Sequence, residues 1–472
     1  MYFGRENLMR PLENKMGVMP IGKLLWNMAL PMALSMLVQA LYNVVDSVFV
    51  SRISDVDNCA LTAVSLAFPV QNIMIGVATG IAVGVNALLS RSLGAKDSEG
   101  VNRSALNGVF LALCGTLLFV LFGAFGAEIY MRSLTADPVT IAYGVDYIRV
   151  ICIVSFGIFG EILFERLLQS TGRTAYTMLT QGVGAIINII LDPILIFGYF
   201  GLPRMEVMGA AVATVLGQIV AFVLAVVLNL KKNPDVQLVF RRFRPEGVML
   251  RRILAIGIPS MVMIAIGSVM NYTFNRILDS YNAVQVGLGE AGKTVFGAYF
   301  KLQSFVFMPV FGINNAVLAI CAYNYGARLP DRITRTIRCG ALGAGCLMLI
   351  GIAVFQLLPG TLLDFFSPDD TMRAVGIPAL RLLSLPFVFA GPCIILGGAF
   401  QGLGKSVYSM IVSICRQLVV LLPAAYLLSL AGEIDLVWLS FPIAEVVSLI
   451  LSIFMMRRVW KQKIQPLRPA AQ

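Results

Sequence analysis

Polar side chains interrupt the long apolar runs of this sequence at only a few positions, and some of them are carboxylates. Asp46 follows Tyr42 by four residues and Asn43 by three, so a helix would hold all three on one face. Asn188 and Asp192 are likewise four residues apart. If these runs cross a bilayer, an ionisable side chain inside one costs at least about 2.5 kcal/mol, so its presence indicates a function.

Carboxylate, amide and hydroxyl oxygens form a hard ligand set, which suits H⁺ or Na⁺ better than a soft metal. Pro193 has no N–H and therefore frees the carbonyl oxygen of Ile189 as a further ligand. The alternative is that the Asp192-Pro193 pair only ends a helix, while Asp46 meets water at the end of its span.

Depth in the membrane supports the first interpretation. At a helical rise of about 1.5 Å per residue, Asp46 lies roughly 33 Å and Asp192 roughly 24 Å from the inner start of its own span. Thr214 lies about 7 Å below the outer start of the next span. All three then fall in the outer half of the same bundle. The predicted cation site, for H⁺ or Na⁺, comprises Asp46, Asn188, Asp192 and Thr214.

The composition requires spans of this kind to position the site. Of the 472 residues 58% are hydrophobic and 13% are charged, and the mean hydropathy is +0.84. These values lie outside the soluble range, so the soluble enzyme classes are unlikely matches. The sequence has no histidine, which excludes His-ligated metals, Ser-His-Asp triads and His proton relays. Its eight cysteines form no C-x-x-C pair and are read as structural.

Twelve apolar segments are long enough to cross the bilayer as helices, so we predict an all-α membrane protein with 12 transmembrane helices. With the N-terminus inside, the inner segments hold 25 of the 36 basic residues, the outer loops five and the spans six. Basic loops stay on the cytoplasmic side, so we expect a multi-pass protein of the cell (inner) membrane with both termini cytoplasmic. The net charge of +11 then reflects topology and contact with the lipid bilayer, and we expect no nucleic-acid partner.

An internal repeat at an offset of 232 residues divides the chain in two. Gly94-Ala95-Lys96 recurs as Gly326-Ala327-Arg328, and Asp137 recurs as Asp369. Six spans per half make the repeats parallel, which is typical of alternating-access transporters. The predicted division is a cytoplasmic segment 1–23, an N-lobe 24–230, a basic linker 231–252, a C-lobe 253–456 and a cytoplasmic tail 457–472.

The second half lacks the two acids but carries other polar groups inside its spans. These are Lys301 with Gln303 close by, Arg381, Arg416 and Glu445. Arg381 is explained by snorkelling at a span end, whereas Lys301 and Glu445 are open to a functional or a structural reading. The first half adds Glu161, Glu165 and Arg166, and Glu165 with Arg166 is read as a local pair.

Several runs resemble one known family. The stretch LYNVVDSVFV at 41–50, with Pro31 fifteen residues before Asp46, is similar to the first helix of the multidrug and toxic compound extrusion (MATE) family. INIILDP at 187–193 and GAAVAT at 209–214 resemble its fifth and sixth helices. AYFKLQ at 298–303 and FMPVFG at 307–312 look like the MepA-type members of its DinF-like branch.

The resemblance implies a V-shaped pair of six-helix lobes that exports small organic cations in exchange for H⁺ or Na⁺, without a cofactor and as a monomer. It implies a coupling-ion site at Asp46, Asn188, Asp192 and Thr214, with Pro31 as a bend. Residues on the supporting or substrate side would be Pro31, Tyr42, Asn43, Lys301 and Gln303. The second lobe has no match for the ion-coupling acids of another branch.

Two alternatives remain. A flippase of lipid-linked saccharides in the same superfamily would share the fold, but it predicts a cavity rich in Arg and Lys for pyrophosphate. An intramembrane enzyme would need a metal or nucleophile constellation. Asp369-Asp370 is the only adjacent acidic pair and follows Ser367-Pro368, which is typical of a solvated turn.

Overall fold

The computed structural model describes residues 14–50, 53, 59–239, 243–283, 286–366 and 368–468, without the side chains of residues 42–44, 47 and 48. All regular elements in this part of the chain are helices. Ten are long and apolar enough to cross a membrane, and two further pairs, bent by 45° and 48°, each supply one more span. The predicted total of twelve is therefore confirmed by length and composition.

The first half holds a short helix followed by six spans. Its elements are α1 (Lys15–Val18), α2 (Ile21–Val50), α3 (Cys59–Gly94), α4 (Ser98–Leu121), the π-helix η1 (Phe122–Gly126), α5 (Ala127–Leu134), α6 (Pro138–Ile153), α7 (Phe156–Ser170), α8 (Thr174–Phe197), the 3₁₀ turn η2 (Tyr199–Gly201) and α9 (Glu206–Lys232).

The second half repeats this order. Its elements are α10 (Gly247–Asp279), η3 (Ser280–Ala283), α11 (Leu288–Gly326), α12 (Pro330–Leu357), α13 (Pro359–Asp364), α14 (Asp370–Ser384), α15 (Phe387–Gly402), α16 (Ser406–Ile414), the π-helix η4 (Cys415–Leu421), α17 (Leu422–Ser429), α18 (Ile434–Val437), α19 (Ser440–Val459), η5 (Trp460–Ile464) and η6 (Gln465–Leu467).

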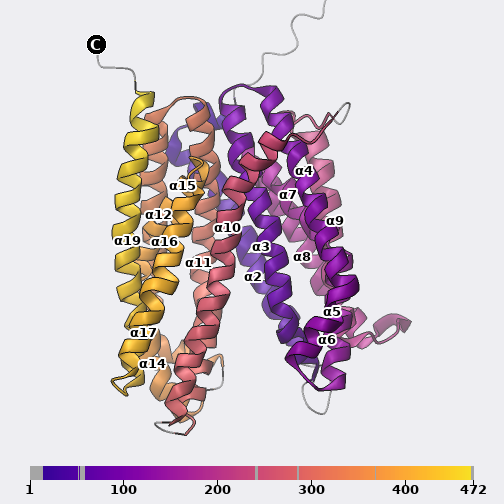
Figure 1. Ribbon diagram of the computed structural model, residues 1–472, viewed down its shortest axis with the longest axis vertical. Helices are drawn as coiled ribbons and strands as arrows, with labels where there is room; N and C mark the ends of the chain where they lie inside the picture. Colours follow the sequence, from indigo (N-terminus) through magenta and orange to yellow (C-terminus); the bar gives the residue numbers. More distant parts are fainter. Residues whose placement is uncertain are drawn as a thin grey trace, which may run out of the picture.

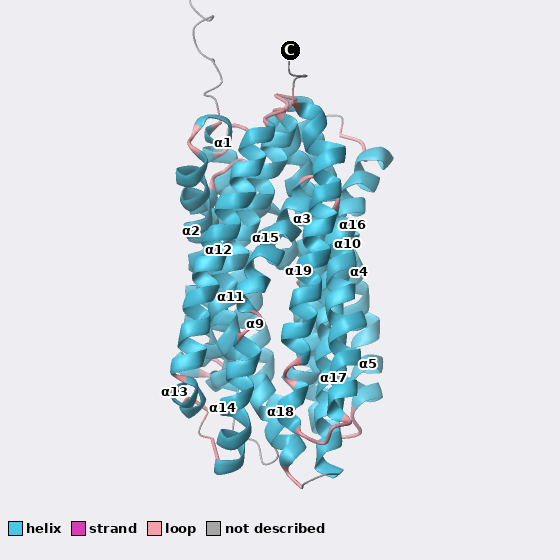
Figure 2. Cartoon of the chain, turned by 90° about the vertical axis from the view of Figure 1, so that its left-hand side faces the viewer, coloured by secondary structure: helices cyan, strands magenta, loops and turns pink. Residues whose placement is uncertain are grey.

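The two halves meet at one end of the molecule and diverge toward the other, which gives the predicted V shape (Figure 1). Helix α1 and the end of α19 lie at the end where the halves meet, which we call the closed end (Figure 2). The opposite end, where α5, α6, α14 and α17 lie, is the open end.

Matching residues of the repeat take matching structural positions. Lys96 and Arg328 both have a φ of 58° and lie just after α3 and α11. Asp137 caps the start of α6 by accepting hydrogen bonds from the backbone of Val139 and Thr140. Asp369 caps α14 through the backbone N–H of Met372, so this acidic pair belongs to a helix start, as a solvated turn would require. The duplication read from the sequence is therefore a structural duplication.

Helix α2 belongs to both halves. Its buried residues near the closed end, such as Met28 and Met32, lie in the hydrophobic core of the second half. Its last residue, Val50, lies in the core of the first half. The helix packs mainly on α11 and on α8. Helix α2 therefore connects the cores of the two halves.

Helices extend beyond the span limits expected from hydropathy. Helix α10 starts at Gly247 rather than near residue 253, and the chain remains helical from α19 through Leu467, beyond the expected limit at residue 456. Hydropathy marks the apolar part of a helix only, whereas backbone hydrogen bonds continue into the interface, where Arg457 and Arg458 are exposed. Part of the expected linker and part of the expected tail are therefore helical.

Candidate functional site

A buried polar cluster joins α8 and α9 in the first half of the chain, on the side nearer the open end. The side-chain amide of Asn188 donates to Oδ1 of Asp192 and to the hydroxyl of Thr214, each at 3.3 Å. Asp192 is 0% exposed, and Asn188 and Thr214 are buried as well. Four-residue spacing places Asn188 and Asp192 on the same face of α8, and that face packs on α9. The structure thus brings these three predicted residues together.

Asp46 completes the cluster from α2. Its carboxylate is close enough to Asp192 for the two charges to interact. Oδ1 of Asp46, Oδ1 of Asn188 and Oδ2 of Asp192 are buried and have no hydrogen-bond partner among the described residues. Buried carboxylate and amide oxygens are costly when unpaired, so three such atoms in one place leave acceptors for a further partner. A proton or a small hard cation fits these oxygens.

The remaining residues predicted for the first-half site have different outcomes. Pro31 lies inside α2, which is helical on both sides of it, and its carbonyl accepts from the hydroxyl of Ser35 at 2.9 Å. Tyr42 and Asn43 lie on α2, but their side chains are outside the described part of the structure. Their predicted support of Asp46 therefore remains a prediction.

The acids of α7 form a separate polar group nearer the closed end. Glu165 is buried and accepts from the hydroxyl of Thr180 at 2.6 Å and from the amide of Gln181 at 2.8 Å. Arg166 donates instead to Gln169 at 2.9 Å. Glu165 thus accepts hydrogen bonds from side chains of α8, whereas Arg166 bonds to a side chain within α7.

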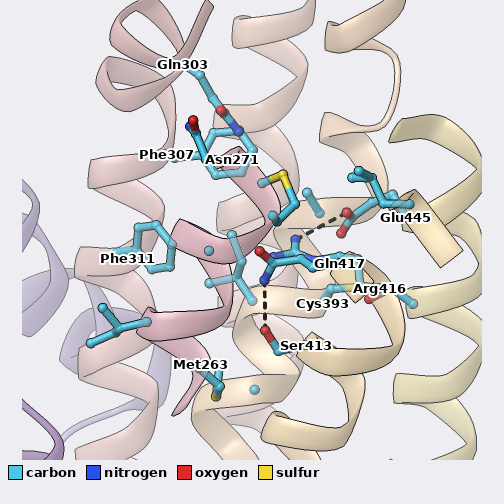
Figure 3. Close-up of a pocket in the computed structure, with 18 of the residues that line it drawn as sticks. Met263, Asn271, Gln303, Phe307, Phe311, Cys393, Ser413, Arg416, Gln417 and Glu445 are labelled. Carbon is cyan, nitrogen blue, oxygen red and sulfur yellow. Dashed lines mark hydrogen bonds and ion pairs between the residues drawn. The ribbon is translucent and has the colours of Figure 1, made fainter. Parts of the chain in front are cut away.

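A large cavity of about 930 Å³ lies mainly within the second half. Helices α10, α11, α15, α16, η4 and α19 line it, and Phe68, Pro69 and Asn72 of α3 close one side. Its wall combines phenyl rings with amide side chains, among them Asn271, Gln303 and Gln417 (Figure 3). Cavities of this size and mixed lining hold drug-sized amphipathic molecules.

Arg416 and Glu445 are the charged residues among the described lining of this cavity. They form an ion pair with Nη1 and Oε2 3.3 Å apart (Figure 3). Arg416 and Gln417 lie in the π-helix η4, and Gln417 donates to the hydroxyl of Ser413 at 2.9 Å. The sequence shows Arg416 and Glu445 as isolated intramembrane charges, but their pairing across two spans carries no sequence signal.

Gln303 and Lys301 separate in the structure. Gln303 lines the cavity, whereas Lys301 is exposed and its ammonium lies 5.9 Å from the centre of the Phe366 ring. Two residues apart on a helix, their side chains point in directions about 200° apart. Of these two residues, both predicted to lie on the supporting or substrate side, only Gln303 therefore lines the cavity.

The closed end is sealed by two close backbone contacts related by the repeat. A Cβ atom on Gly94 would lie 1.9 Å from the carbonyl oxygen of Tyr323, and one on Gly326 would lie 1.9 Å from that of Arg91. Glycine is required at both positions because α3 and α11 cross here backbone to backbone. Behind this crossing, Val83, Ala87, Ile256 and Leu318 form a small buried plug between the halves.

Helix α1 reinforces the seal by contacting both halves. The amide of Asn14 donates to the carbonyl of Thr171 in the first half at 3.1 Å. Arg332 of the second half donates to the carbonyls of Met16 and Met19 at 2.9 and 2.8 Å. Access to the cavity and to the acidic cluster therefore lies toward the open end.

These features define a class of protein, a multi-pass membrane transporter with two repeated six-helix halves around internal sites. The model of the MatE family matches residues 31–194 and 259–427. The chain belongs to this family, and it is a transporter rather than an enzyme. The predicted resemblance is confirmed.

Relatives agree with this assignment over most of their length. The chain is 27% identical to the "Probable multidrug resistance protein YoeA" of Bacillus subtilis, with 92% of this chain and 93% of that one covered. It is 24% identical to the "Multidrug export protein MepA" of Staphylococcus haemolyticus, with the same coverage of 92% and 93%. A solved structure described as the outward-facing conformation of a multidrug resistance MATE transporter superposes with a TM-score of 0.87 at 26% identity, covering 97% of this chain and 98% of that one.

Proposed function

We propose that this protein is a secondary active multidrug exporter, which expels cationic amphipathic compounds by H⁺ or Na⁺ antiport through alternating access. The observation that carries the proposal is the buried cluster of Asp46, Asn188, Asp192 and Thr214. It contains two carboxylates and three unpaired buried oxygens, and none of its four residues is among those that line the large second-half cavity. An exchanger needs one site for the ion and one for the cargo, and the two halves supply one each.

Coupling follows from the position of α2 between these sites. Two carboxylates close together in a dry site resist simultaneous ionisation, so a proton or Na⁺ stabilises the cluster and allows α2 and α8 to pack more closely. Helix α2 also contacts α11, where Ala33 lies against Gly312, and the neighbouring Phe311 and Asn314 line the cavity. Ion binding and cargo binding then favour different packings of α2, which is the free-energy coupling that exchange requires.

The flippase alternative is less well supported by the cavity. Binding of a pyrophosphate group calls for several unpaired Arg or Lys side chains. Among the described lining residues Arg416 is the one cation, and Glu445 pairs with it. The cluster in the first half is acidic and neutral in composition. Both sites therefore favour positively charged cargo over a polyanion.

We further propose that the chain lies in the cell (inner) membrane with the closed end in the cytoplasm, and that it acts as a monomer. The N-lobe and C-lobe would be the bodies that rock, at the expected limits 24–230 and 253–456, joined by the segment 231–252. The closed end carries the basic loops and the open end faces the outside. In this orientation the ion enters the cluster from outside the cell. The cargo leaves the cavity through the open end, also to the outside.

Thiol labelling tests this orientation. In a background with all eight native cysteines replaced, a single cysteine at Gln237 or Gln465 should resist an impermeant maleimide in intact cells, because both lie near the closed end. A cysteine at Leu202, exposed in the loop after η2 at the open end, should be labelled under the same conditions. Labelling at 237 or 465 with protection at 202 would invert the proposed orientation.

Efflux of matched dyes tests the cargo class. Cells that express the protein should expel ethidium and rhodamine cations several-fold faster than cells without it, and other lipophilic cations should compete. Anionic dyes of similar size should leave at the background rate, because Glu445 and the acidic cluster repel them. Transport of a lipid-linked pyrophosphate without cation efflux would instead support the flippase alternative.

A further inference from the structure

The ion pair in the second-half cavity leaves hydrogen-bonding groups of both residues without a partner. Glu445 is 7% exposed, and its Oε1 atom is buried without a hydrogen-bond partner among the described residues. Its other oxygen shares a single contact of 3.3 Å with Arg416. A buried carboxylate with one oxygen unpaired is costly, and Glu445 lines the cavity, so a ligand that lets this carboxylate turn toward it can supply the missing donor.

Arg416 is left equally incomplete. A guanidinium has five N–H donors, and the hydrogen bond to Glu445 uses one of them. The Arg416 side chain is 32% exposed and lines the cavity. Its remaining donors suit a carboxylate of the ligand, which guanidinium groups bind with charge-assisted hydrogen bonds. The cavity thus offers a cationic and an anionic contact side by side.

The local backbone supports a dedicated role for Arg416. It lies in a seven-residue π-helix, Cys415–Leu421, in the middle of a span that is otherwise α-helical. π-Helical turns inside α-helices are rare and are frequently found at functional sites. At the repeat offset of 232, Arg416 and Glu445 correspond to Gly184 and Ala213. Helix α8 of the first half has no π-helical turn along its described length, so the π-helix at Arg416 has no counterpart at the matching position, although the first half has its own π-helix η1 in another span.

Aromatic rings line the same cavity as the pair. Phe307, Phe387 and Phe441 line the same cavity, and Phe307 meets Phe387 edge to face with ring centres 5.0 Å apart. Flat phenyl surfaces bind planar aromatic rings of a ligand. Asn271 and Gln303 provide neutral hydrogen-bonding groups opposite (Figure 3). A ligand that matches all these groups is a planar aromatic compound with a cationic and an anionic end.

We propose that Arg416 and Glu445 form a charge-selectivity pair, which makes the second-half cavity prefer zwitterionic planar aromatic compounds over singly charged ones. The cationic end of the ligand contacts Glu445 and its carboxylate contacts Arg416. A simple cation still binds Glu445 but meets the positive charge of Arg416, and a simple anion meets Glu445. This inference rests on the proposed export function, and it adds zwitterions to the proposed cationic cargo as the compounds that the cavity binds best.

Rhodamine 110 and rhodamine 123 test the proposal, because they share one ring system and differ only in that the carboxylate of the zwitterion is a methyl ester in the cation. Fluorescence anisotropy with purified protein in detergent measures both affinities without any gradient. The wild type should bind rhodamine 110 about tenfold tighter than rhodamine 123, as expected for one charge-assisted contact. Fluorescein, as an anion, should bind more weakly than either.

Variants should move this ratio in opposite directions. Arg416→Gln should remove the preference for the zwitterion, because its carboxylate loses its partner. Glu445→Gln should weaken the cation more than the zwitterion, since Arg416 then repels the cation without compensation. Arg381→Gln removes the same charge from an exposed site outside the described cavity lining and should leave the ratio unchanged.

A structural role of the pair would change both affinities by the same factor, and that outcome would overturn the proposal. The double variant Arg416→Glu/Glu445→Arg keeps both charges and should retain the preference, so it serves if a single variant fails to fold. Loss of the preference in a folded double variant would equally contradict the proposal. Intact binding ratios without gradient-driven efflux would instead reject the proposed function and leave the selectivity pair standing.

Discussion

Replacing Asp46 or Asp192 by asparagine is expected to abolish gradient-driven efflux, with transport at least tenfold below the wild-type rate. Asparagine keeps the shape of the side chain but cannot be protonated or supply a negative charge for Na⁺. Without that change of charge, the packing of α2 against α8 no longer depends on the ion, so the gradient cannot drive transport. Efflux of ethidium from cells under a defined ion gradient measures the effect.

Drug binding should survive in the same variants, because the described cavity lies mainly in the second half and neither aspartate is among its lining residues. Dye affinity in detergent should stay within about threefold of the wild type. Asp369→Asn and Asp370→Asn provide the matched controls, since Asp369 only caps α14 and Asp370 is its first residue. Near wild-type pumping by both Asp46→Asn and Asp192→Asn would reject the first-half site and make Lys301, Glu445 and Glu161 the next candidates.

Gly94→Ala should prevent full closure at the closed end. The added Cβ would lie 1.9 Å from the carbonyl oxygen of Tyr323, which belongs to the backbone of α11 and cannot move aside alone. Overpacking of this kind costs about 1–3 kcal/mol, enough to shift a balanced conformational equilibrium by about 5-fold to 150-fold. Gly326→Ala should act in the same way against Arg91.

A cysteine at Ala87, which is buried in the plug between the halves, reports this opening. Its labelling by a thiol reagent applied from the closed end should rise at least tenfold in the Gly94→Ala background, and transport should fall. Gly345→Ala, with nothing within 4 Å of its added Cβ, is the control and should change neither. Unchanged labelling and transport in Gly94→Ala would mean that the α3–α11 crossing does not limit access.

Much of this architecture can be predicted from local patterns in the sequence. Apolar runs define the spans because the bilayer requires each helix to satisfy its own hydrogen bonds, and the repeat of Gly94-Ala95-Lys96 as Gly326-Ala327-Arg328 shows the duplication. The grouping of Asn188 with Asp192 follows from helical spacing, and the depth of Thr214 follows from span direction. In each case the information lies within one helix or in a comparison of lengths.

Contacts between helices could not be obtained in this way. The pairing of Arg416 with Glu445 depends on how α16, η4 and α19 pack, and nothing in either span marks the partner. The sharing of α2 between both cores is hidden for the same reason, since apolar faces do not say which neighbour covers them. Lys301 and Gln303 are two residues apart in the sequence, yet the rotation of α11 alone decides that Gln303 reaches the cavity.

The central claim, that the acidic cluster exchanges an ion for cargo, is tested most directly by running the exchange backward. Purified protein is reconstituted into liposomes with a reporter of internal pH or Na⁺, and an ethidium gradient is imposed with no ion gradient present. The wild type is expected to move H⁺ or Na⁺ against the flow of dye, and Asp192→Asn is expected to move none. Dye movement by the wild type without any counterflow of either ion, or an undiminished counterflow in Asp192→Asn, would contradict the account.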